Sequence, residues 1–188
     1  MSKTKQNSLT RFYSGKFGDD FILRNNDGTS VITKLPKISA VPRTEQQNNV
    51  VYNFRMAVSY AKTCMGDPAM KALYEARASK RNSAYRLAMA DYLNAPQVSK
   101  IDTRGYSGHA GDKISLMVTD RIQAKTVVVT IVDPGGNLVE QGDCTVDSTG
   151  TLWSYVATTD VVTLSGTVIT VTATDYPGNT GTGMVTLL

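Results

Sequence analysis

The pattern of hydrophobic positions changes from a helical period to an extended one close to residue 96. Between residues 44 and 95, apolar side chains recur at every third or fourth position, which predicts amphipathic helices. From residue 97 onward, apolar and polar positions alternate in short runs rich in Val and Thr, which predicts half-buried strands. The chain is therefore predicted to be α+β with two domains.

The N-terminal segment is predicted to be a flexible arm followed by a β-hairpin. Residues 1–11 are polar and basic and offer almost nothing to bury, so we expect a mobile arm over residues 1–14 unless a partner orders it. The runs 21–24 and 29–33 are β-prone and flank a turn that ends in Asp27-Gly28, which is a strong hairpin signal. Because an isolated hairpin is marginally stable, we expect this one to pack on the helices of the same chain or on a neighbouring subunit.

Three helices with recognisable caps are predicted after the hairpin. A T-x-x-Q capping box at residues 44–47 opens the first helix and Gly66 ends it. Asp67-Pro68 opens the second helix, and Asn82 or Ser83 caps the third. These positions are expected to face the helical core: Val50, Val51, Phe54, Ala57, Val58, Ala61, Met70, Leu73, Tyr74, Ala84, Tyr85, Leu87, Ala88 and Leu93.

The domain boundary is predicted at Pro96, because the residue before a proline is pushed out of the helical region. This gives a hairpin and helical domain at residues 15–95 and a β-sandwich at residues 96–188. A hairpin and three helices supply a small core, near the limit of independent stability, so a partner is expected.

The C-terminal half is predicted to contain eight short strands separated by turn residues, as in a β-sandwich. Within the seventh run, Ile169, Val171 and Ala173 are expected to face the core, and Trp153 is expected to pack in the core or at its rim. The predicted strands are Gln97–Ile101, Lys113–Thr119, Lys125–Val132, Leu138–Gln141, Cys144–Val146, Leu152–Ala157, Thr167–Thr174 and Thr182–Leu187.

Two segments of this half resemble known modules. Residues 127–142 (VVVTIVDPGGNLVEQG) and 168–180 (VITVTATDYPGNT) are similar to bacterial immunoglobulin-like and fibronectin-type-III-like domains. That resemblance implies an immunoglobulin-like sandwich of the kind found in surface adhesins and in tailed-phage capsid and tail proteins. More weakly, Gly15, Gly18 and Arg24, with Ala90–Leu93, resemble uncharacterised proteins of Bacteroidota and their phages, which imply no activity.

Charge is distributed unevenly along the 188 residues. The net charge is +4, with 15 Lys and Arg against 7 Asp and Glu in residues 1–95, and 5 against 9 in residues 96–188. No run is long and apolar enough for a membrane helix, and the first twenty residues lack the apolar block of a secretory signal peptide. We therefore expect neither membrane insertion nor a signal-directed export route.

Candidate chemistry is sparse. Two cysteines, expected to be buried or half-buried thiols, and one histidine leave little for a disulfide framework, a zinc site or a catalytic triad. His109 is expected in an exposed loop, Asp19-Asp20 has poor geometry for shared acid–base work, and residues 15–18 do not form a P-loop. No cofactor site is predicted. Aspartates at predicted strand ends could converge on Ca²⁺, or could simply form turns: Asp102, Asp112, Asp120, Asp133, Asp147 and Asp175.

The leading functional hypothesis is a non-enzymatic virion protein of a tailed phage, assembled in the bacterial cytoplasm. In this hypothesis Phe17, Phe21 and Ile22 anchor the hairpin on other virion proteins present in multiple copies, and the sandwich projects. The expected assembly contacts also include these basic residues: Arg24, Lys71, Arg77, Arg81 and Arg86.

Two other readings of the sequence stay open. The basic residues of the helices could instead contact nucleic acid nonspecifically, or could be ordinary solvated surface. A different class, a surface adhesin or glycan-binding module, would need exposed aromatic rings gathered at one end of the sandwich: Trp153, Tyr155, Tyr106 and Tyr176.

Overall fold

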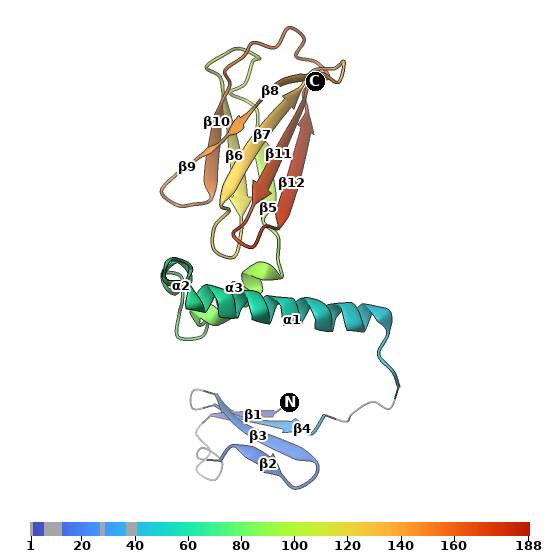
Figure 1. Ribbon diagram of the computed structural model, residues 1–188, viewed down its shortest axis with the longest axis vertical. Helices are drawn as coiled ribbons and strands as arrows, with labels where there is room; N and C mark the ends of the chain where they lie inside the picture. Colours follow the sequence, from blue (N-terminus) through green and yellow to red (C-terminus); the bar gives the residue numbers. More distant parts are fainter. Residues whose placement is uncertain (1, 6–12, 27–28, 37–40) are drawn as a thin grey trace. The chain divides into compact units, whose positions relative to one another are not determined.

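The computed structural model describes residues 2–5, 13–26, 29–36 and 41–188. Within these residues the chain is α+β and mostly β, with three helices and three four-stranded sheets (Figure 1). It separates into two compact units, Met1–Thr44 and Glu45–Leu188. None of the helices in the described residues is long and apolar enough to cross a membrane.

The first unit is an antiparallel sheet of four strands. These are β1 (Ser2–Lys5), β2 (Gly15–Phe17), β3 (Phe21–Asn26) and β4 (Thr29–Lys34), in the order β1-β4-β3-β2. The predicted hairpin is confirmed as β3 and β4, whose register runs from Phe21 opposite Lys34 to Asn26 opposite Thr29. Asp27 and Gly28, the predicted turn, lie outside the described residues.

The prediction of a flexible arm over residues 1–14 is wrong for Ser2–Lys5, because these residues form β1 and pair with β4. The exposed edge of β4 supplies the unpaired amide and carbonyl groups that β1 satisfies. Residues 6–12 of the predicted arm lie outside the described residues. The sheet therefore has four strands where the sequence indicated a hairpin.

The helices are α1 (Glu45–Gly66), α2 (Pro68–Glu75) and α3 (Ala84–Tyr92), and the predicted N-terminal caps of α2 and α3 are confirmed. The carboxylate of Asp67 accepts hydrogen bonds from the amides of Ala69 and Met70, which opens α2 just before Pro68. Ser83 caps α3 by accepting from the amide of Arg86 at 3.4 Å. Local capping chemistry thus determines where these helices begin.

The predicted apolar stripe of α1 is only partly buried. Ala57 and Ala61 are buried, as is Cys64, whereas Val50 is 68% exposed and Phe54 is 51% exposed. The reason is length: α1 has 22 residues, or about 33 Å at about 1.5 Å per residue, whereas α2 has 8 and α3 has 9. The short helices cover the second half of α1 and leave the first half exposed.

Eight strands follow, and each corresponds to a predicted one. They form two antiparallel sheets, with the orders β5-β6-β10-β9 and β12-β11-β7-β8. Their bounds are β5 (Gln97–Asp102), β6 (Lys113–Thr119), β7 (Thr126–Val132), β8 (Leu138–Asp143), β9 (Thr145–Val146), β10 (Leu152–Val156), β11 (Val168–Thr174) and β12 (Thr180–Thr186).

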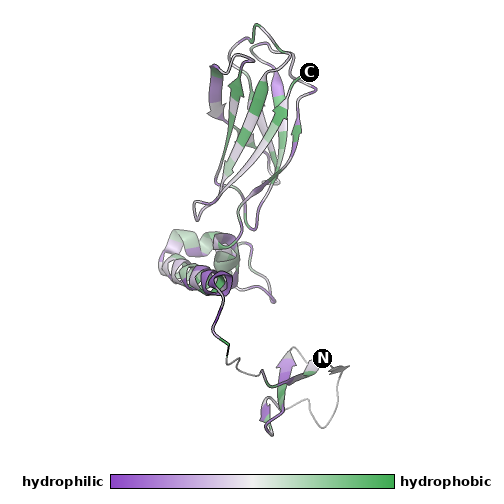
Figure 2. Ribbon diagram, turned by 90° about the vertical axis from the view of Figure 1, so that its right-hand side faces the viewer, coloured by the Kyte–Doolittle hydropathy of each residue, from purple (hydrophilic) through white to green (hydrophobic). Residues whose placement is uncertain are grey.

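The two sheets share one hydrophobic core, so residues 97–186 form a β-sandwich. Alternate residues of β6, β7, β10 and β11 point inward, and hydrophobic residues are distributed along these strands (Figure 2). The predicted inward positions Ile169, Val171 and Ala173 are completely buried. Trp153 is a core residue, as predicted, and Tyr155 lies beside it on the same face of β10.

The helices and the sandwich belong to the same compact unit, so the units divide between residues 44 and 45, not at the predicted boundary of 95 and 96. Ile122, from the loop between β6 and β7, is buried in the helical core beside Tyr74 and Ala88. The side-chain amide of Asn179 also donates to the backbone carbonyls of Asp91 and Tyr92. These contacts join the helical segment to one end of the sandwich.

The close approach of β5 and β12 gives a stability prediction. A Cβ at Gly181 would overlap the backbone carbonyl of Pro96, so Gly181→Ala is expected to lower the free energy of unfolding by about 1–3 kcal/mol. Gly66→Ala is the matched control, because its Cβ would meet open space at the end of α1 and should change stability by less than about 0.5 kcal/mol. Chemical unfolding of both variants measures the difference, and equal losses would contradict the packing argument.

Candidate functional site

The N-terminal sheet presents an apolar face to solvent. Register places Phe17 opposite Phe21 and Leu23 opposite Ile32, so that these side chains lie on one face. Phe17 is 67% exposed and Phe21 is 40% exposed. Together with Tyr13 they line a hollow of about 690 Å³ on the sheet.

This sheet has almost no core of its own. Among the described residues of the first unit, Val31 is the one buried hydrophobic side chain and Ser30 is the one buried polar side chain. The hydroxyl of Ser30 has no hydrogen-bond partner in the described part of the chain. A sheet usually buries one hydrophobic face against another layer of structure, and the described residues of this unit supply no such layer.

The structure brings together two of the predicted anchors and separates the third. Phe17 and Phe21 are direct cross-strand partners at the end of β2 and the start of β3. Ile22 pairs with Lys16 and Thr33, and as the next residue along β3 it lies on the opposite face and is half-buried. Arg24, two residues further, shares that face and is exposed. The exposed apolar face is therefore that of Phe17 and Phe21, extended by Tyr13.

Apart from Arg24 on β3, the basic residues predicted as assembly contacts lie on the surface of α2, α3 and their connection. Lys71 forms an ion pair with Glu75 at 3.7 Å. The guanidinium of Arg86 donates to the backbone carbonyl of Arg81 at 2.7 Å, which brings those two cations together. Arg77 is exposed at the end of α2. These contacts are typical of solvated helix surface and do not by themselves define a site.

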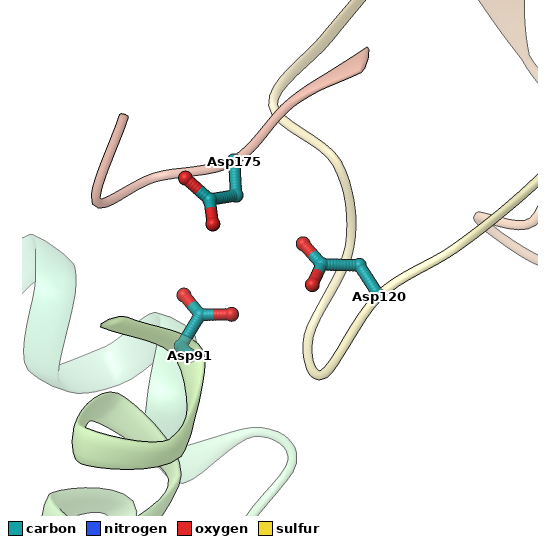
Figure 3. Close-up of side chains that lie close together, drawn as sticks. All are labelled: Asp91, Asp120 and Asp175. Carbon is teal, nitrogen blue, oxygen red and sulfur yellow. The ribbon is translucent and has the colours of Figure 1, made fainter. Parts of the chain in front are cut away.

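Three carboxylates converge between the helices and the sandwich (Figure 3). Asp91 lies in the last turn of α3, Asp120 directly follows β6, and Asp175 directly follows β11. One oxygen from each lies within 4.8 Å of the others. Asp91 and Asp175 are buried, at 0% and 1% exposure, and Asp120 is half-buried.

A hydrogen-bond network holds Asp175 in place. One carboxylate oxygen accepts from the amides of Gly178 and Asn179 at 2.8 and 2.6 Å, and the other accepts from the Asn179 side chain at 2.8 Å. The D-x-x-G-N turn is therefore closed by its own aspartate. Because Asn179 also donates to the carbonyl of Asp91, the turn and the end of α3 are positioned together.

Asp91 is held from the helical side by two tyrosines. The hydroxyl of Tyr74 donates to Asp91 Oδ2 at 2.7 Å, and the hydroxyl of Tyr60 lies 3.0 Å from that of Tyr74. The ring of Tyr60 also packs on that of Tyr92, with centroids 5.4 Å apart. This chain of hydroxyls leads from α1 through α2 to the carboxylate.

The pKa values of these groups are shifted in the direction that disfavours their negatively charged forms. Burial raises the pKa of Asp91 to about 7, against the hydrogen bond from Tyr74, and the nearby Asp120 and Asp175 raise it further. Burial also raises the pKa of Asp120, against the hydrogen bond from the amide of Arg121. The pKa of Tyr74 is raised well above its ordinary value, first by burial and then by its hydrogen bonds to Tyr60 and Asp91. The cluster therefore disfavours negative charge.

Two carboxylate oxygens of the cluster have no hydrogen-bond donor beside them in the described part of the chain. Asp91 Oδ1 and Asp120 Oδ2 are buried and accept no hydrogen bond within the described residues. Over the same residues, none of the three aspartates forms an ion pair with a lysine or arginine. Buried carboxylate oxygens normally have a donor or a cation, so these two indicate an incomplete site.

The remaining aspartates at strand ends serve turns. Asp102 binds Arg104, and Asp112 accepts from Ser107 and the amide of His109. Asp133 accepts from Asn137, and Asp147 accepts from Thr149. Of the six aspartates predicted from the sequence, only Asp120 and Asp175 therefore join the cluster.

Asp91 is not among the site residues predicted from the sequence. Its spacing carries a signal, because Asp91 follows Ala84 and Ala88 at helical spacing and so lies on the buried stripe of α3. A lone acidic residue on an apolar helix face needs a partner from another element. The sequence does not identify that partner, because only the folded structure brings the ends of β6 and β11 against α3.

The other groups considered for chemistry lie apart from the cluster. His109 is exposed, as predicted, with Nδ1 3.7 Å from the carboxylate of Asp160. Cys64 and Cys144 are free thiols, buried and half-buried as predicted. Burial raises the pKa of Cys144 to about 12, which keeps this thiol protonated at neutral pH.

Comparisons with known proteins show only remote similarity. No protein-family model and no curated protein matches the sequence. Among solved structures, CopC from Methylosinus trichosporium OB3b is 13% identical with a TM-score of 0.35, over 47% of this chain and 87% of that one. A tetra-tandem repeat from the extending region of a large adhesion protein is 22% identical, with a TM-score of 0.32, over 50% of this chain and 24% of that one. The N-terminal part of the bacterial S-layer protein SbsC is 15% identical, with a TM-score of 0.33, over 72% and 37%.

Proposed function

We propose that this chain is a non-enzymatic structural protein of a multi-subunit particle, a tailed-phage virion, to which it is attached by its N-terminal sheet. The observation that carries the proposal is the apolar face formed by Tyr13, Phe17, Phe21, Leu23 and Ile32 on a sheet with a single buried hydrophobic residue among its described residues. Exposed apolar patches on otherwise polar surfaces mark interaction sites. The sheet gains its missing layer when a partner covers this face.

Charge favours a partner of opposite sign. Residues 1–44 contain eight Lys and Arg residues and three Asp residues, a net charge of +5. The partner surface is therefore an apolar patch rimmed by carboxylates. Such complementarity increases the rate of association and selects the orientation of docking. In this proposal the apolar contact supplies the affinity and the basic rim supplies the specificity.

The second unit is proposed to carry an immunoglobulin-like domain at residues 96–188, as a stable module of the particle. The strand orders β5-β6-β10-β9 and β12-β11-β7-β8 support this proposal, because immunoglobulin-like sandwiches pair their first, second, fifth and fourth strands in one sheet. In such domains the third, sixth and seventh strands form the other sheet, with an added strand beside the third. The order of the eight strands here follows the same plan.

The alternative function, glycan binding, lacks the exposed aromatic rings that it requires. It required exposed aromatic rings at one end of the sandwich, but Trp153, Tyr155 and Tyr106 are 5–6% exposed and belong to the core. Tyr176 is half-buried. Stacking on a sugar needs an accessible ring face, which these buried side chains do not offer. Nonspecific binding of nucleic acid by the basic helix surface stays secondary, because Lys71 is already paired with Glu75.

The test compares incorporation of full-length variants into particles. Mass spectrometry of purified particles should find the chain, and Phe17→Asp with Phe21→Asp should reduce its incorporation by about tenfold or more. Placing two carboxylates in an apolar contact costs more than about 2 kcal/mol, which is more than tenfold in affinity. Near-ultraviolet circular dichroism of Trp153, the single tryptophan, checks that the second unit stays folded.

Val162→Asp is the matched control. Val162 is fully exposed in a loop of the sandwich, so this variant adds a carboxylate at a hydrophobic surface position of the second unit, outside the N-terminal sheet. We expect its incorporation to equal that of the unmodified chain. A chain that is absent from purified particles and is a monodisperse monomer in solution would overturn the proposal. So would equal incorporation of all three proteins.

A further inference from the structure

We propose that Asp91, Asp120 and Asp175 bind a Ca²⁺ ion that ties the end of α3 to the two turns of the sandwich that follow β6 and β11. The inference is independent of the docking proposed above, because it concerns only the second unit. It starts from the two buried oxygens that lack a partner, Asp91 Oδ1 and Asp120 Oδ2. Both belong to carboxylates that face a common centre (Figure 3).

The geometry suits a cation of this size. Calcium binds oxygen ligands at about 2.3–2.6 Å, so two ligands of one ion lie at most about 5 Å apart. The three carboxylates each offer one oxygen within 4.8 Å of the others. Carboxylate oxygens are hard ligands, which favours Ca²⁺ over the transition metals that prefer nitrogen or sulfur. Water molecules complete the six to eight ligands that Ca²⁺ takes.

The surroundings fit an ion better than a fourth protein group. Within the described residues, no lysine or arginine forms an ion pair with any of the three carboxylates. Two buried carboxylates and a half-buried one repel one another at this distance, and a divalent cation removes this cost. The positions of Asp175 and Asp91 are set by Asn179 and Tyr74, so the ligands are oriented in advance.

Solvent reaches the cluster from the side of Asp120. An open cavity of about 510 Å³ is lined by Asp120, by residues of the connection between α3 and β5 such as Asn94, and by Gln97 at the start of β5. Asp120 is half-buried, whereas the other two ligands are fully enclosed. An ion can therefore enter past Asp120.

A shared proton is the competing occupant. In the absence of an ion, a protonated Asp91 can donate a hydrogen bond to a neighbouring carboxylate and relieve part of the repulsion. This alternative predicts no response to Ca²⁺ at any pH. The two occupants are separated by adding the metal, because Ca²⁺ requires the deprotonated carboxylates and stabilises only the folded chain that assembles them.

The experiment uses the full-length chain, freed of metal with a chelator and titrated with CaCl₂ by calorimetry at neutral pH. Saturable binding to one site is expected, with a rise in the unfolding midpoint of about 5–10 °C at about 100 times Kd. TbCl₃ gives a second readout, because a tyrosine beside a bound Tb³⁺ sensitises its luminescence. Tyr74 lies 2.7 Å from Asp91 Oδ2 and is positioned for this transfer.

The variants separate a ligand from a general effect of charge. Asp120→Asn keeps the oxygen that accepts from the amide of Arg121, and Asp91→Asn keeps an acceptor for Tyr74. Both are expected to fold and to bind Ca²⁺ at least about tenfold more weakly. Asp143→Asn removes the same charge from an exposed position of β8 and should bind as the unmodified chain does.

Two results would overturn the proposal. One is the absence of both calorimetric heat and Tb³⁺ luminescence from the unmodified chain, which would leave the proton as the occupant. The other is an equal response to Ca²⁺ in the Asp120→Asn, Asp91→Asn and Asp143→Asn proteins, which would show that the metal acts elsewhere on the surface.

Discussion

The free energy of unfolding is expected to fall as the pH rises from about 4 to about 7 when no divalent cation is present. Burial raises the pKa of Asp91 to about 7 in the folded chain, whereas an unfolded Asp titrates near about 3.9. Between these values the folded chain binds the proton and the unfolded chain does not. Stability is therefore fully present below about pH 4 and is lost as the pH passes through about 7.

The largest slope that one such group supplies is about 1.4 kcal/mol per pH unit. The titratable and charged groups that face Asp91 come from every element packed on it: Tyr60 and Cys64 of α1, Tyr74 of α2, Asp120 and Arg121 of the β6–β7 loop, and Asp175. The carboxylates raise the pKa of Asp91, and the tyrosine hydroxyls stay protonated throughout this range. Asp91 is thus expected to dominate the pH dependence.

Urea unfolding followed by the fluorescence of Trp153 at a series of pH values measures this slope. Asp91→Asn should remove most of it, because an amide does not titrate, whereas Asp143→Asn should keep it. A slope that is unchanged in the Asp91→Asn protein would assign the effect to other groups. With Ca²⁺ present the sign should reverse, since the metal competes with the proton.

Glu140→Ala is expected to lower the free energy of unfolding by about 3–5 kcal/mol. Glu140 lies on β8, is 7% exposed, and accepts three hydrogen bonds through Oε2. The donors are the hydroxyl of Tyr155 at 3.0 Å, the amide of Thr158 at 2.9 Å and the hydroxyl of Thr158 at 2.7 Å. Alanine leaves these donors without an acceptor, and each buried donor that lacks a hydrogen bond costs about 1–3 kcal/mol.

Two variants on the same strand are compared with Glu140→Ala for their effect on the free energy of unfolding. Glu140→Gln keeps an accepting oxygen without the charge, so its loss should be clearly smaller than that of Glu140→Ala. Gln141→Ala changes the next residue, which is exposed on the other face, and should shift stability by less than about 0.5 kcal/mol. Losses of similar size in Glu140→Ala and Gln141→Ala would contradict the proposed role of the carboxylate as a buried acceptor. Chemical unfolding curves provide the comparison.

The carboxylate cluster and the apolar sheet face have different origins in the sequence. Phe17 and Phe21 are visible as hydrophobic residues in a polar, basic segment, so the sequence already pointed to a contact surface there. The cluster draws its ligands from positions 91, 120 and 175, which are separated by 29 and 55 residues. Local sequence patterns do not predict that these three carboxylates converge, because their convergence depends on how α3 packs against the ends of two strands.

The sequence by itself determined the local elements. Short β-prone runs separated by turn residues marked all eight strands of the sandwich, Asp67 marked the start of α2, Asn82 or Ser83 that of α3, and Asp27-Gly28 the hairpin of β3 and β4. These features depend on neighbours a few residues away, because capping, turn formation and the strand period are local interactions.

Only the tertiary structure decided which hydrophobic positions are buried and which polar ones meet. The same helical stripe of α1 is exposed at Val50 and buried at Ala61, since α2 and α3 reach only part of its length. Ser2–Lys5 becomes a strand because the edge of β4 is free to pair. Asp91 acquires its acidic neighbours because the helical segment packs on the end of the sandwich, and long-range packing of this kind has no signature in a local window.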